Sequence, residues 1–507
     1  MKNKSTGPML NAYPDSMGGS LKDIVTILEK DEFRNVFDGF YILPSLFHSD
    51  LDRGFSIIDY ELDEDLATER DLERLKALGI ALKLDFVLNH KSVNSMEFKD
   101  VLEKGAASEY KDFFINWNNF WKGYGSLSAD GYIVPEQKYI KDMFFRKPGL
   151  PILMVDFPDG TRVPYWNTFY QEVKDDPKSP FGKKYLGQMD LNIKSPLVWK
   201  DYEETLKKLA SYGAKLVRLD AFAYAPKEPG QRNFLNEPGT WDFLEQIQEL
   251  ADQIDLTLLP EIHASYGKKI YEKLSRKGYM TYDFFLPGLL IYAIENRSGE
   301  CLVRWAEELR QKQIRTVNML GCHDGIPVLD LKGFLPDKEI QKLIDLLVGR
   351  GGYVKNLHGQ KNMYYQVNAT YYSALGEDDR KLLFARAVQM FMPGRPQVWY
   401  LDLFAGKNDY DAVRRAGEGG HKEINRTNLR TEDVEKLMNQ EVVKEQLRLL
   451  KFRNSCEAFG EEAVLTMETE GSKVKFLWTR GKYQAGLIAD FQSYKYEIVT
   501  EIENDNR

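Results

Sequence analysis

Short apolar runs rich in β-branched and aromatic residues alternate with amphipathic helical segments, such as 201–213 and 241–253, over about 400 of the 507 residues. Alternation of this kind is typical of parallel β/α units. We therefore predict an α/β fold, a (β/α)8 TIM barrel with its chemistry at the carboxyl ends of the strands. An open doubly wound sheet is the alternative, although no GxGxxG turn follows an early strand. The predicted strands are 37–47, 79–90, 215–224, 256–263, 315–324 and 395–404.

Two intervals interrupt this alternation, and a third segment follows it. Residues 91–194 are aromatic, turn-rich and irregular, which predicts an inserted subdomain. Residues 325–377 predict a second insertion that carries a polar loop. Residues 463–507 contain strand-like pieces and predict a small C-terminal β domain. The catalytic barrel would then consist of residues 1–90, 195–324 and 378–462.

Composition and charge argue against several classes of function. The net charge of −8 provides no basic stripe for a phosphate backbone, so we expect no nucleic-acid partner. The N-terminal segment lacks the apolar core of a signal peptide, and no apolar run reaches the ~18 residues of a membrane span. We therefore expect a cytoplasmic protein without a membrane partner. Cys301, Cys322 and Cys456 lack the spacing of a zinc site or a redox pair.

Three carboxylates, Asp220, Glu261 and Asp324, lie at or near the ends of predicted strands. Because residues i and i+2 of a strand face the same side, Arg218 should lie beside Asp220, and His263 beside Glu261. An adjacent guanidinium lowers a carboxyl pKa, so Arg218 would keep Asp220 ionised and nucleophilic. Glu261 has no arginine beside it in sequence, and desolvation should raise its pKa, which suits a general acid.

One ionised and one protonated carboxyl group facing a common pocket is the requirement for retaining glycosyl transfer, at a separation of about 5–5.5 Å. Three of the six histidines, His90, His263 and His323, also fall at strand ends beside these acids, which favours a site there. Two simpler interpretations stay open. Arg218 and Asp220 could be a buried ion pair that only fixes the barrel, and Glu261 could be a solvated strand-end carboxylate.

Four motifs stand in order along the chain: DFVLNH (85–90), VRLDAFAY (217–224), LPEIH (259–263) and MLGCHDG (319–325). Together they resemble the ordered motifs of the α-amylase superfamily, and the flanking sequence is similar to that of sucrose phosphorylases and close relatives. The flanking motifs are AYPDSMGGSL (12–21), DRGFSIIDY (52–60), YDFFLP (282–287), YQVNATYYSAL (365–375), LFAGKNDY (403–410) and EINR (423–426).

The resemblance implies a role for each strand-end acid: Asp220 as nucleophile, Glu261 as general acid/base and Asp324 as the carboxylate that holds sugar hydroxyls. It implies conversion of sucrose and inorganic phosphate to α-glucose 1-phosphate and fructose through a β-glucosyl-enzyme. It implies no cofactor and no metal, although Asn89 occupies a position that helps to bind calcium in some amylases. Further substrate-binding residues would be Asp52, Phe55, His90, Gln188, Arg218, Tyr224, His263, His323, Tyr365, Gln366 and Arg426.

The acceptor side departs from the sucrose phosphorylase pattern. Gly321 stands where aspartate is usual, and Asn362–Met363 stand where the acceptor loop usually carries Leu-Asp. Cations on two loops could bind inorganic phosphate or the phosphate ester of sucrose 6′-phosphate, because a phosphate gains charge-assisted hydrogen bonds from them. They are Arg146, Lys147 and His358, with Lys361 as an ordinary solvated charge.

Several functions with the same catalytic residues therefore remain open. Tyr365 stands where a relative specialised for the phosphate ester has histidine, which favours sucrose over sucrose 6′-phosphate. The chain could also be a glucosylglycerate or glucosylglycerol phosphorylase, a hydrolase or transglucosidase, or a catalytically silent sugar-binding barrel. The expected partners are a small sugar and inorganic phosphate, and a homodimer is left open.

Overall fold

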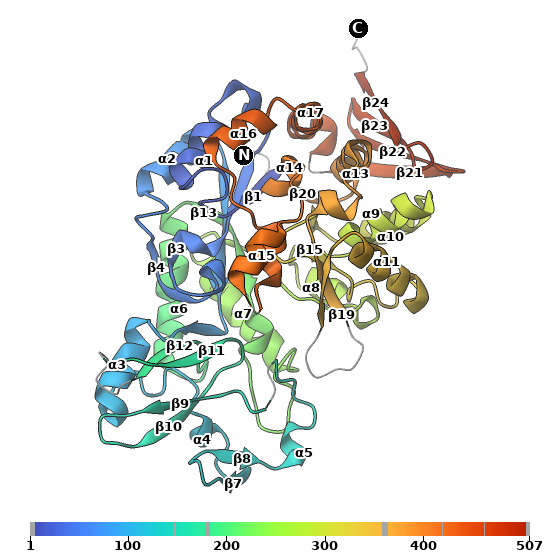
Figure 1. Cartoon of the computed structure of the whole chain (residues 1–507). Helices are drawn as coiled ribbons and strands as arrows, with labels where there is room; N and C mark the ends of the chain where they lie inside the picture. The colour runs from blue at the N-terminus through green and yellow to red at the C-terminus, as the bar shows by residue number, and fades with distance from the viewer. Residues whose placement is uncertain are drawn as a thin grey trace.

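The computed structural model describes residues 6–146, 149–177, 183–356, 364–417, 419–460 and 462–502. Eight strands form one sheet in the order β14-β13-β5-β2-β1-β20-β16-β15, and every pair within it is parallel. The two outer strands, β14 and β15, pack against each other, so the sheet nearly closes into the predicted barrel (Figure 1). The strands are β1 (Met9–Ala12), β2 (Gly39–Ile42), β5 (Ala81–Val87), β13 (Ala214–Asp220), β14 (Thr257–Pro260), β15 (Thr281–Asp283), β16 (Thr316–Met319) and β20 (Arg395–Trp399).

Helices surround the barrel, and many of them bury one apolar face against it. In α6 (Pro196–Ser211), the buried side chains include Val198, Tyr202, Leu206 and Leu209, which recur at helical spacing. No helix of the described residues is both long enough and apolar enough to cross a membrane. The other main helices are α1 (Leu21–Leu28), α2 (Glu69–Ala77), α7 (Gly239–Asp252), α8 (Ile270–Arg276), α9 (Leu286–Asn296), α10 (Glu300–Gln311), α11 (Asp337–Gly349), α13 (Asp379–Phe391) and α17 (Glu441–Ser455).

The barrel confirms the predicted fold class, but most of the six predicted strands end earlier than expected. The first ends at Ile42 because Pro44 begins a 3-10 turn. The strand predicted over 256–263 ends at Pro260, so Glu261 and His263 lie beyond it. In the last, 395–404, residues from Tyr400 onward form helix α14 (Tyr400–Leu403). Prediction missed β1 and β15, which have only four and three residues.

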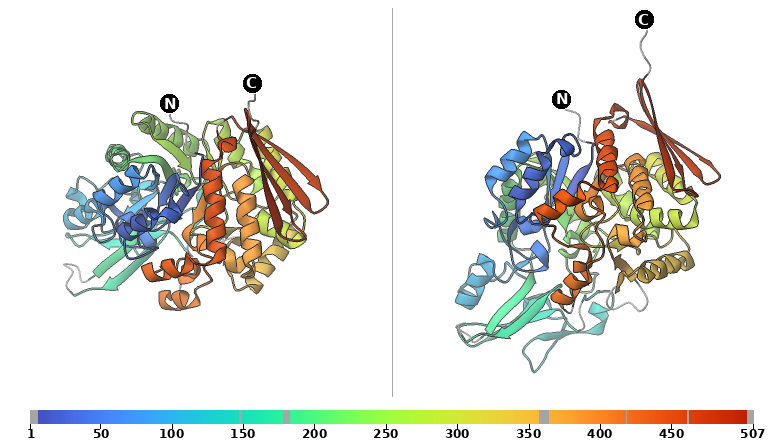
Figure 2. Two further views of the ribbon diagram at one scale, coloured as in Figure 1. Left: turned by 90° about the horizontal axis from the view of Figure 1, so that it is seen from above. Right: turned by 45° about the horizontal axis from the view of Figure 1, so that its top comes forward.

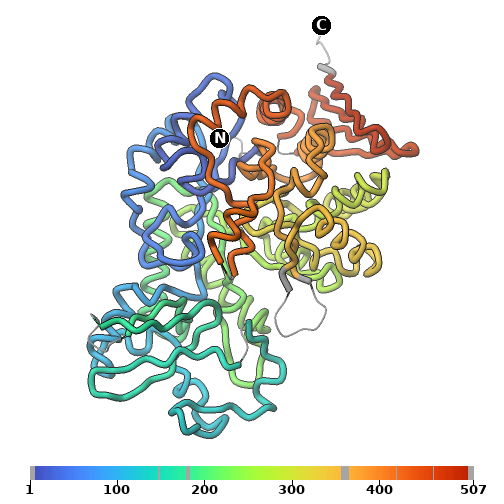
Figure 3. Tube along the Cα trace, viewed as in Figure 1, coloured from blue at the N-terminus to red at the C-terminus, as the bar shows by residue number. Residues whose placement is uncertain are grey.

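The segment between β5 and α6 lies at one end of the molecule (Figures 1 and 3). Its first and last strands, β6 and β12, pair with each other in antiparallel orientation. Four aromatic and aliphatic side chains give it a small core of its own: Ile115, Trp117, Trp121 and Trp166. Its elements are β6 (His90–Ser92), α3 (Met96–Lys104), α4 (Trp117–Phe120), β7 (Gly125–Leu127), β8 (Ile133–Pro135), α5 (Gln137–Ile140), β9 (Ile152–Asp156), β10 (Arg162–Trp166), β11 (Gln171–Asp175) and β12 (Lys183–Asp190).

The C-terminal segment forms a four-stranded antiparallel sheet at the other end of the molecule (Figure 2). It packs on α13 through Phe384 and Phe491, whose rings are 4.8 Å apart. The strands are β21 (Val464–Glu470), β22 (Lys473–Arg480), β23 (Tyr483–Asp490) and β24 (Lys495–Ile502). The remaining elements are β3 (Phe47–Ser49), β4 (Ile57–Leu62), β17 (Ile326–Pro327), β18 (Tyr353–Asn356), β19 (Tyr364–Asn368), α12 (Tyr371–Ala374), α15 (Tyr410–Ala416) and α16 (Thr431–Leu437).

Candidate active site

Arg218 lies at the centre of the carboxylates, near the end of β13. Its Nη1 donates to Asp220 Oδ1 at 2.7 Å and to Asp85 Oδ1 at 2.6 Å, and its Nη2 lies 3.7 Å from Glu261 Oε1. Asp85 at the barrel core is fully buried and also accepts hydrogen bonds from Tyr41. The guanidinium is thus held by the buried Asp85, and two of the three predicted catalytic carboxylates, Asp220 and Glu261, lie within 4 Å of it.

Glu261 has a second neighbour, His263, which the strand pattern predicted beside it but not as a cation. His263 Nε2 lies 3.3 Å from Glu261 Oε1, and His263 Nδ1 lies 3.1 Å from Asp330 Oδ2. The imidazole also stacks on Phe284 at 3.7 Å. Burial opposes the charged form of His263, but Asp330 and Glu261 outweigh it and raise its pKa to about 10. His263 is therefore a cation that faces Glu261.

The proton distribution between the two acids is the reverse of the expected one. Burial raises the pKa of Asp220 to about 7, although Arg218 opposes this. Burial also opposes ionisation of Glu261, but Arg218 and then His263 lower its pKa below the ordinary value. Our expectation that Arg218 acts on Asp220 alone was therefore wrong, because the same guanidinium reaches both acids. The two carboxyl groups act as one coupled pair that holds a single proton over the intervening pH range.

A second group of charges lies around Asp324, which follows β16. Lys422 Nζ is 2.9 Å from Asp324 Oδ1, and His323 Nε2 is 3.2 Å from Asp324 Oδ2. Asp52 lies 3.7 Å from both Lys422 and Arg426. Arg426 in turn donates from Nε to the His323 backbone oxygen at 2.8 Å. The predicted residues Asp52, His323, Asp324 and Arg426 are thus brought together, and Lys422 is an addition that the sequence did not reveal.

Beside this charged group lie the Phe55 ring, the His90 imidazole and the Gln188 amide. Phe55 stacks on His323 at 5.2 Å, and the Arg218 guanidinium lies 5.5 Å from the same ring. His90 Nε2 lies 2.8 Å from the Phe55 backbone oxygen, and Gln188 Nε2 donates to that oxygen at 3.2 Å. Burial lowers the pKa of His323 to about 3, so this histidine is neutral. The four predicted side chains Phe55, His90, Gln188 and His323 are thus connected to one another through Phe55.

The predicted acceptor residues form a separate, more aromatic group. Arg146 Nη1 donates to the Tyr224 hydroxyl at 2.9 Å, and its guanidinium lies 5.1 Å from the Phe169 ring. Tyr365 meets His263 edge-on at 5.0 Å, and Gln366 Nε2 donates to the Asp324 backbone oxygen at 2.9 Å. Tyr365 and Gln366 thus contact His263 and the backbone of Asp324, next to the predicted catalytic acids. Lys147, His358, Lys361 and the Asn362–Met363 pair lie outside the described residues.

Gly321, the other departure from the family pattern, has a local cause in the structure. Its amide donates to Asp402 Oδ2 at 2.9 Å, and Asp402 is fully buried. A Cβ added at this position would lie 2.5 Å from the same oxygen. An aspartate side chain would therefore clash with Asp402 and repel it, so glycine is required here as long as Asp402 keeps its place.

Asn89 contacts a lysine. Lys227 Nζ donates to Asn89 Oδ1 at 2.9 Å and to the Tyr224 backbone oxygen at 2.5 Å, and it lies 2.8 Å from Asp190 Oδ2. All of these groups are buried. The ammonium joins β12, the end of β5 and the segment after β13. Among the residues that the structure describes, no group of three or more His, Cys, Asp or Glu side chains is arranged to hold a metal ion.

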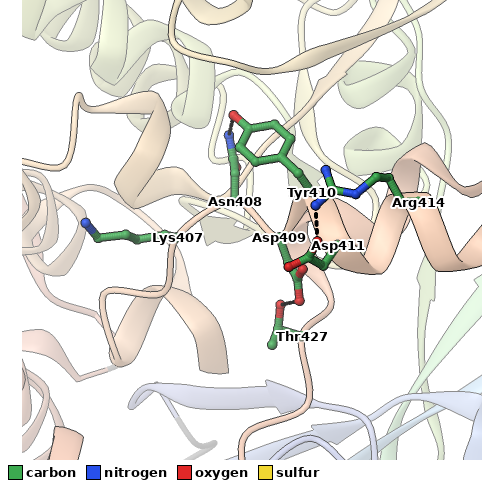
Figure 4. Close-up of a pocket in the computed structure, with 7 residues that line it drawn as sticks. All are labelled: Lys407, Asn408, Asp409, Tyr410, Asp411, Arg414 and Thr427. Atoms are coloured by element: carbon green, nitrogen blue, oxygen red, sulfur yellow. Dashed lines mark hydrogen bonds and ion pairs between the residues drawn. The ribbon is translucent and has the colours of Figure 1, made fainter.

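The structure has two pockets that could be considered for this site. One is narrow and is lined in part by Arg218, Glu261, His263, His323, Asp324 and Gln366. The other is open, has a volume of about 440 Å³ and lies beside α15 (Figure 4). Its polar groups are paired with one another, as in the hydrogen bond from Thr427 to Asp409 and the ion pair of Arg414 with Asp411. Since its lining includes no predicted site residue, we place the chemistry at the first pocket.

Comparison with known proteins shows the family to which the chain belongs. Residues 34–325 match the family model "Alpha amylase, catalytic domain". The chain is 53% identical over 504 residues, covering 97% of this chain and 95% of the relative, to a "Sucrose 6(F)-phosphate phosphorylase" of Ilumatobacter coccineus. It is 36% identical over 468 residues, covering 91% and 90%, to a "Sucrose phosphorylase" of Streptococcus mutans.

A solved structure shows the same relationship. The crystal structure of sucrose 6F-phosphate phosphorylase from Thermoanaerobacter thermosaccharolyticum has a TM-score of 0.88 at 36% identity and covers 99% of this chain and 96% of its own. The predicted family resemblance is thereby confirmed. The chain belongs to the α-amylase superfamily and, within it, to the glycoside phosphorylases, which are glycosyltransferases.

Proposed function

We propose that this protein is a retaining glucoside phosphorylase that acts on sucrose 6(F)-phosphate and transfers its glucosyl group to inorganic phosphate. The observation that carries this proposal is the 53% identity, over nearly the whole of both chains, to a relative of that name. The pocket supports it at two levels. The coupled carboxyl pair fits the transfer chemistry, and Arg146 fits a phosphate ester on the departing sugar.

In the first step, Asp220 attacks the anomeric carbon of the bound glucosyl group as the bond to the aglycone oxygen breaks. Glu261 gives that oxygen a proton, so the fructose 6-phosphate leaves as an alcohol, and a β-glucosyl ester on Asp220 remains. This first step requires a deprotonated Asp220 and a protonated Glu261. Because the pair shares one proton, this active form is one of the two arrangements of the singly protonated pair.

In the second step, an oxygen of inorganic phosphate attacks the anomeric carbon of the glucosyl ester from the face opposite Asp220, and the Asp220 carboxylate is the leaving group. The bond to Asp220 breaks and α-glucose 1-phosphate forms, so two inversions give net retention. Phosphate is itself acidic, and Glu261 therefore contributes less as a base here than it would for water. His263 and Arg218 hold Glu261 as an anion at this stage, which also suits a site that has just given up its proton.

The acceptor side supports a charged aglycone. Among the described residues, Arg146 forms no ion pair with a carboxylate, and its nearest partners are the Tyr224 hydroxyl and the Phe169 ring. A guanidinium presents several donors in a fixed fork that matches a phosphate group. An arginine framed by aromatic rings is thus ready to pair with an anionic ligand.

Sucrose itself is the second candidate, and Tyr365 is the feature that favours it. A tyrosine offers a hydroxyl but no positive charge to the acceptor, in the place where the phosphate-ester relative has histidine. A relative of Marinobacter adhaerens named "Glucosylglycerol phosphorylase" is 33% identical over 504 residues. Glycerol is therefore a third candidate for the aglycone.

The test is formation of α-glucose 1-phosphate from a panel of donors with and without phosphate. The panel contains sucrose 6(F)-phosphate, sucrose, glucosylglycerol and glucosylglycerate. We expect phosphate-dependent product from all donors that react, with the highest kcat/KM for sucrose 6(F)-phosphate. Equal glucose release with and without phosphate would instead show a hydrolase, and saturable sugar binding without turnover would show a silent barrel. A higher kcat/KM for sucrose would overturn the proposed donor and leave the phosphorylase.

A further inference from the structure

Lys422 is a largely buried cation that no part of the proposed reaction uses. It lies in the 3-10 turn η7 (Gly420–Asn425), four residues before Arg426, and its side chain is 19% exposed. Its Nζ is 2.9 Å from Asp324 Oδ1 and 3.7 Å from Asp52 Oδ2. These carboxylates come from loops more than 250 residues apart, so the fold brings both of them to one ammonium.

The arrangement differs from an ordinary surface ion pair. Arg426 already lies 3.7 Å from Asp52 and 4.0 Å from Asp324, so the two carboxylates stand between two cations. The carboxylates keep part of their surface open, 42% for Asp52 and 23% for Asp324, while the Arg426 side chain is only 1% exposed. Lys422, at 19%, is therefore the more exposed of the two cations, and both carboxylates are more exposed than either cation.

A sugar hydroxyl can use both kinds of group at once. It donates its proton to a carboxylate, and its oxygen accepts from a cation. Lys422 carries three donors on a flexible stem, and its contacts with Asp324 and Asp52 leave it able to offer one to a ligand at the same place. Arg426 is less accessible to a ligand because its side chain is only 1% exposed: its Nε donates to the His323 backbone oxygen, its Nη1 lies 3.4 Å from Glu423, and its Nη2 is buried.

We propose that Lys422 is a further sugar-binding residue of this pocket, which donates to the 3- or 4-hydroxyl of the transferred glucosyl group while Asp324 or Asp52 accepts from that hydroxyl. The identity of the ring as glucosyl rests on the proposed function. The role of Lys422 itself rests on the cluster of two carboxylates and two cations, of which it is the more exposed cation.

The other charged groups around Lys422 are compatible with this role. Burial disfavours its charged form, but Asp324 and Asp52 outweigh burial and raise its pKa, so it is a cation at neutral pH. Arg426 opposes this, and Glu423 lies on the same turn. His323 stays neutral because burial lowers its pKa to about 3, so it does not compete as a third cation.

The experiment compares binding of D-glucose, 3-deoxyglucose and 4-deoxyglucose to the wild type, Lys422→Met and Lys422→Arg by calorimetry. Lys407→Met is the matched control, since Lys407 is an exposed lysine of the same surface region, paired with Glu377. Unfolding temperatures of all variants show whether they are folded. Phosphorolysis by the wild type is measured separately, so failure of the proposed function would be seen without reference to Lys422.

We expect Lys422→Met to weaken D-glucose binding by about 10- to 100-fold, the usual loss for a hydrogen bond to a charged group. The loss should fall below about threefold for the deoxy sugar that lacks the contacted hydroxyl. Lys422→Arg should recover part of the affinity, and Lys407→Met should bind all three sugars like the wild type.

Equal losses on all three sugars, or no loss on any, would overturn the proposal. A variant that is folded but loses D-glucose and both deoxy sugars alike would show that Lys422 only holds Asp324 and Asp52 in place. A wild type that binds none of the sugars would also contradict it. If Lys422→Met does not fold, the same comparison in Lys422→Arg and Lys422→Gln decides the question.

Discussion

The two ends of the pocket are built in different ways. At the donor end, side chains from the carboxyl ends of barrel strands are cross-linked by ion pairs, with Arg218 joined to Asp85, Asp220 and Glu261. At the acceptor end, Arg146 comes from a long insertion and is held by Tyr224 and the Phe169 ring. Under the proposed function, the scaffold would hold the glucosyl group and the loops would select the group that leaves or enters. This division explains how relatives with different named substrates can share one barrel.

The largest expected effect comes from removing the nucleophile at the donor end. Asp220→Ala abolishes the covalent route, so we expect phosphorolysis to fall by on the order of 10⁴-fold or more with every donor. The measurement is initial release of α-glucose 1-phosphate. Asp411→Ala, an exposed carboxylate paired with Arg414, is the control and should keep full activity. More than a tenth of the wild-type rate in Asp220→Ala would refute the assignment.

Next in size is the loss of the proton donor, which should depend on the leaving group. We expect Glu261→Gln to lower kcat/KM by about 10²- to 10⁴-fold on sucrose 6(F)-phosphate and sucrose, whose leaving oxygens need a proton. With α-glucosyl fluoride, whose fluoride leaves without protonation, the loss should stay below about tenfold. Equal losses on the two kinds of donor would contradict the acid role of Glu261.

A smaller and selective effect would sharpen the contrast between the two ends. In an Asp220→Asn background that cannot react, we expect Arg146→Met to weaken sucrose 6(F)-phosphate binding by about 10- to 100-fold, because a charge-assisted contact to phosphate is lost. Sucrose binding should change little. Lys138→Met, an exposed lysine of the same insertion, is the control. Parallel losses on both sugars would place Arg146 in general packing rather than in recognition of the ester.

The smallest effect is a change of rate with pH. The singly protonated carboxyl pair is the active form, so kcat/KM for sucrose should be bell-shaped. Its alkaline limb should lie near pH 7, since burial raises the pKa of Asp220 to about 7, and kcat/KM should fall there by about tenfold per pH unit as the shared proton is lost.

The acid limb of that profile should lie below the ordinary range of a glutamate, because Arg218 and His263 overcome burial and lower the pKa of Glu261. Sucrose is the substrate to use, since it carries no ionisable phosphate of its own. A rate that continues to rise above pH 8 would show that the carboxyl pair does not share its proton as described.

Much of the donor end could be predicted because its chemistry lies at strand ends that are visible in the sequence. Asp220 follows a run of buried residues directly, and the i,i+2 rule correctly placed Arg218 beside it. The same rule was applied to Glu261 and His263, which do contact each other, although β14 ends before both. What the sequence could not reveal is Asp330, which faces His263 from 67 residues away and makes it a cation.

Other features could not be predicted, either because an element is very short or because its contacts join residues far apart in the sequence. Strand β15 is three residues long, too short for an alternation to be recognised. Lys422 looks like an ordinary solvated charge until the fold places Asp52 and Asp324 against it. Acceptor residues lie on loops, where neither helical nor strand periodicity applies, and so the sequence allowed several aglycones.

The most direct test of the donor-end chemistry is to trap the covalent intermediate. Glu261→Gln is mixed with α-glucosyl fluoride in the absence of phosphate, quenched rapidly and analysed by peptide mass spectrometry. We predict the mass of one hexosyl group on the peptide that contains Asp220, and its disappearance when phosphate is added, with release of α-glucose 1-phosphate. A hexosyl group on another carboxylate, or turnover to α-glucose 1-phosphate with no modified peptide at any quench time, would contradict the account.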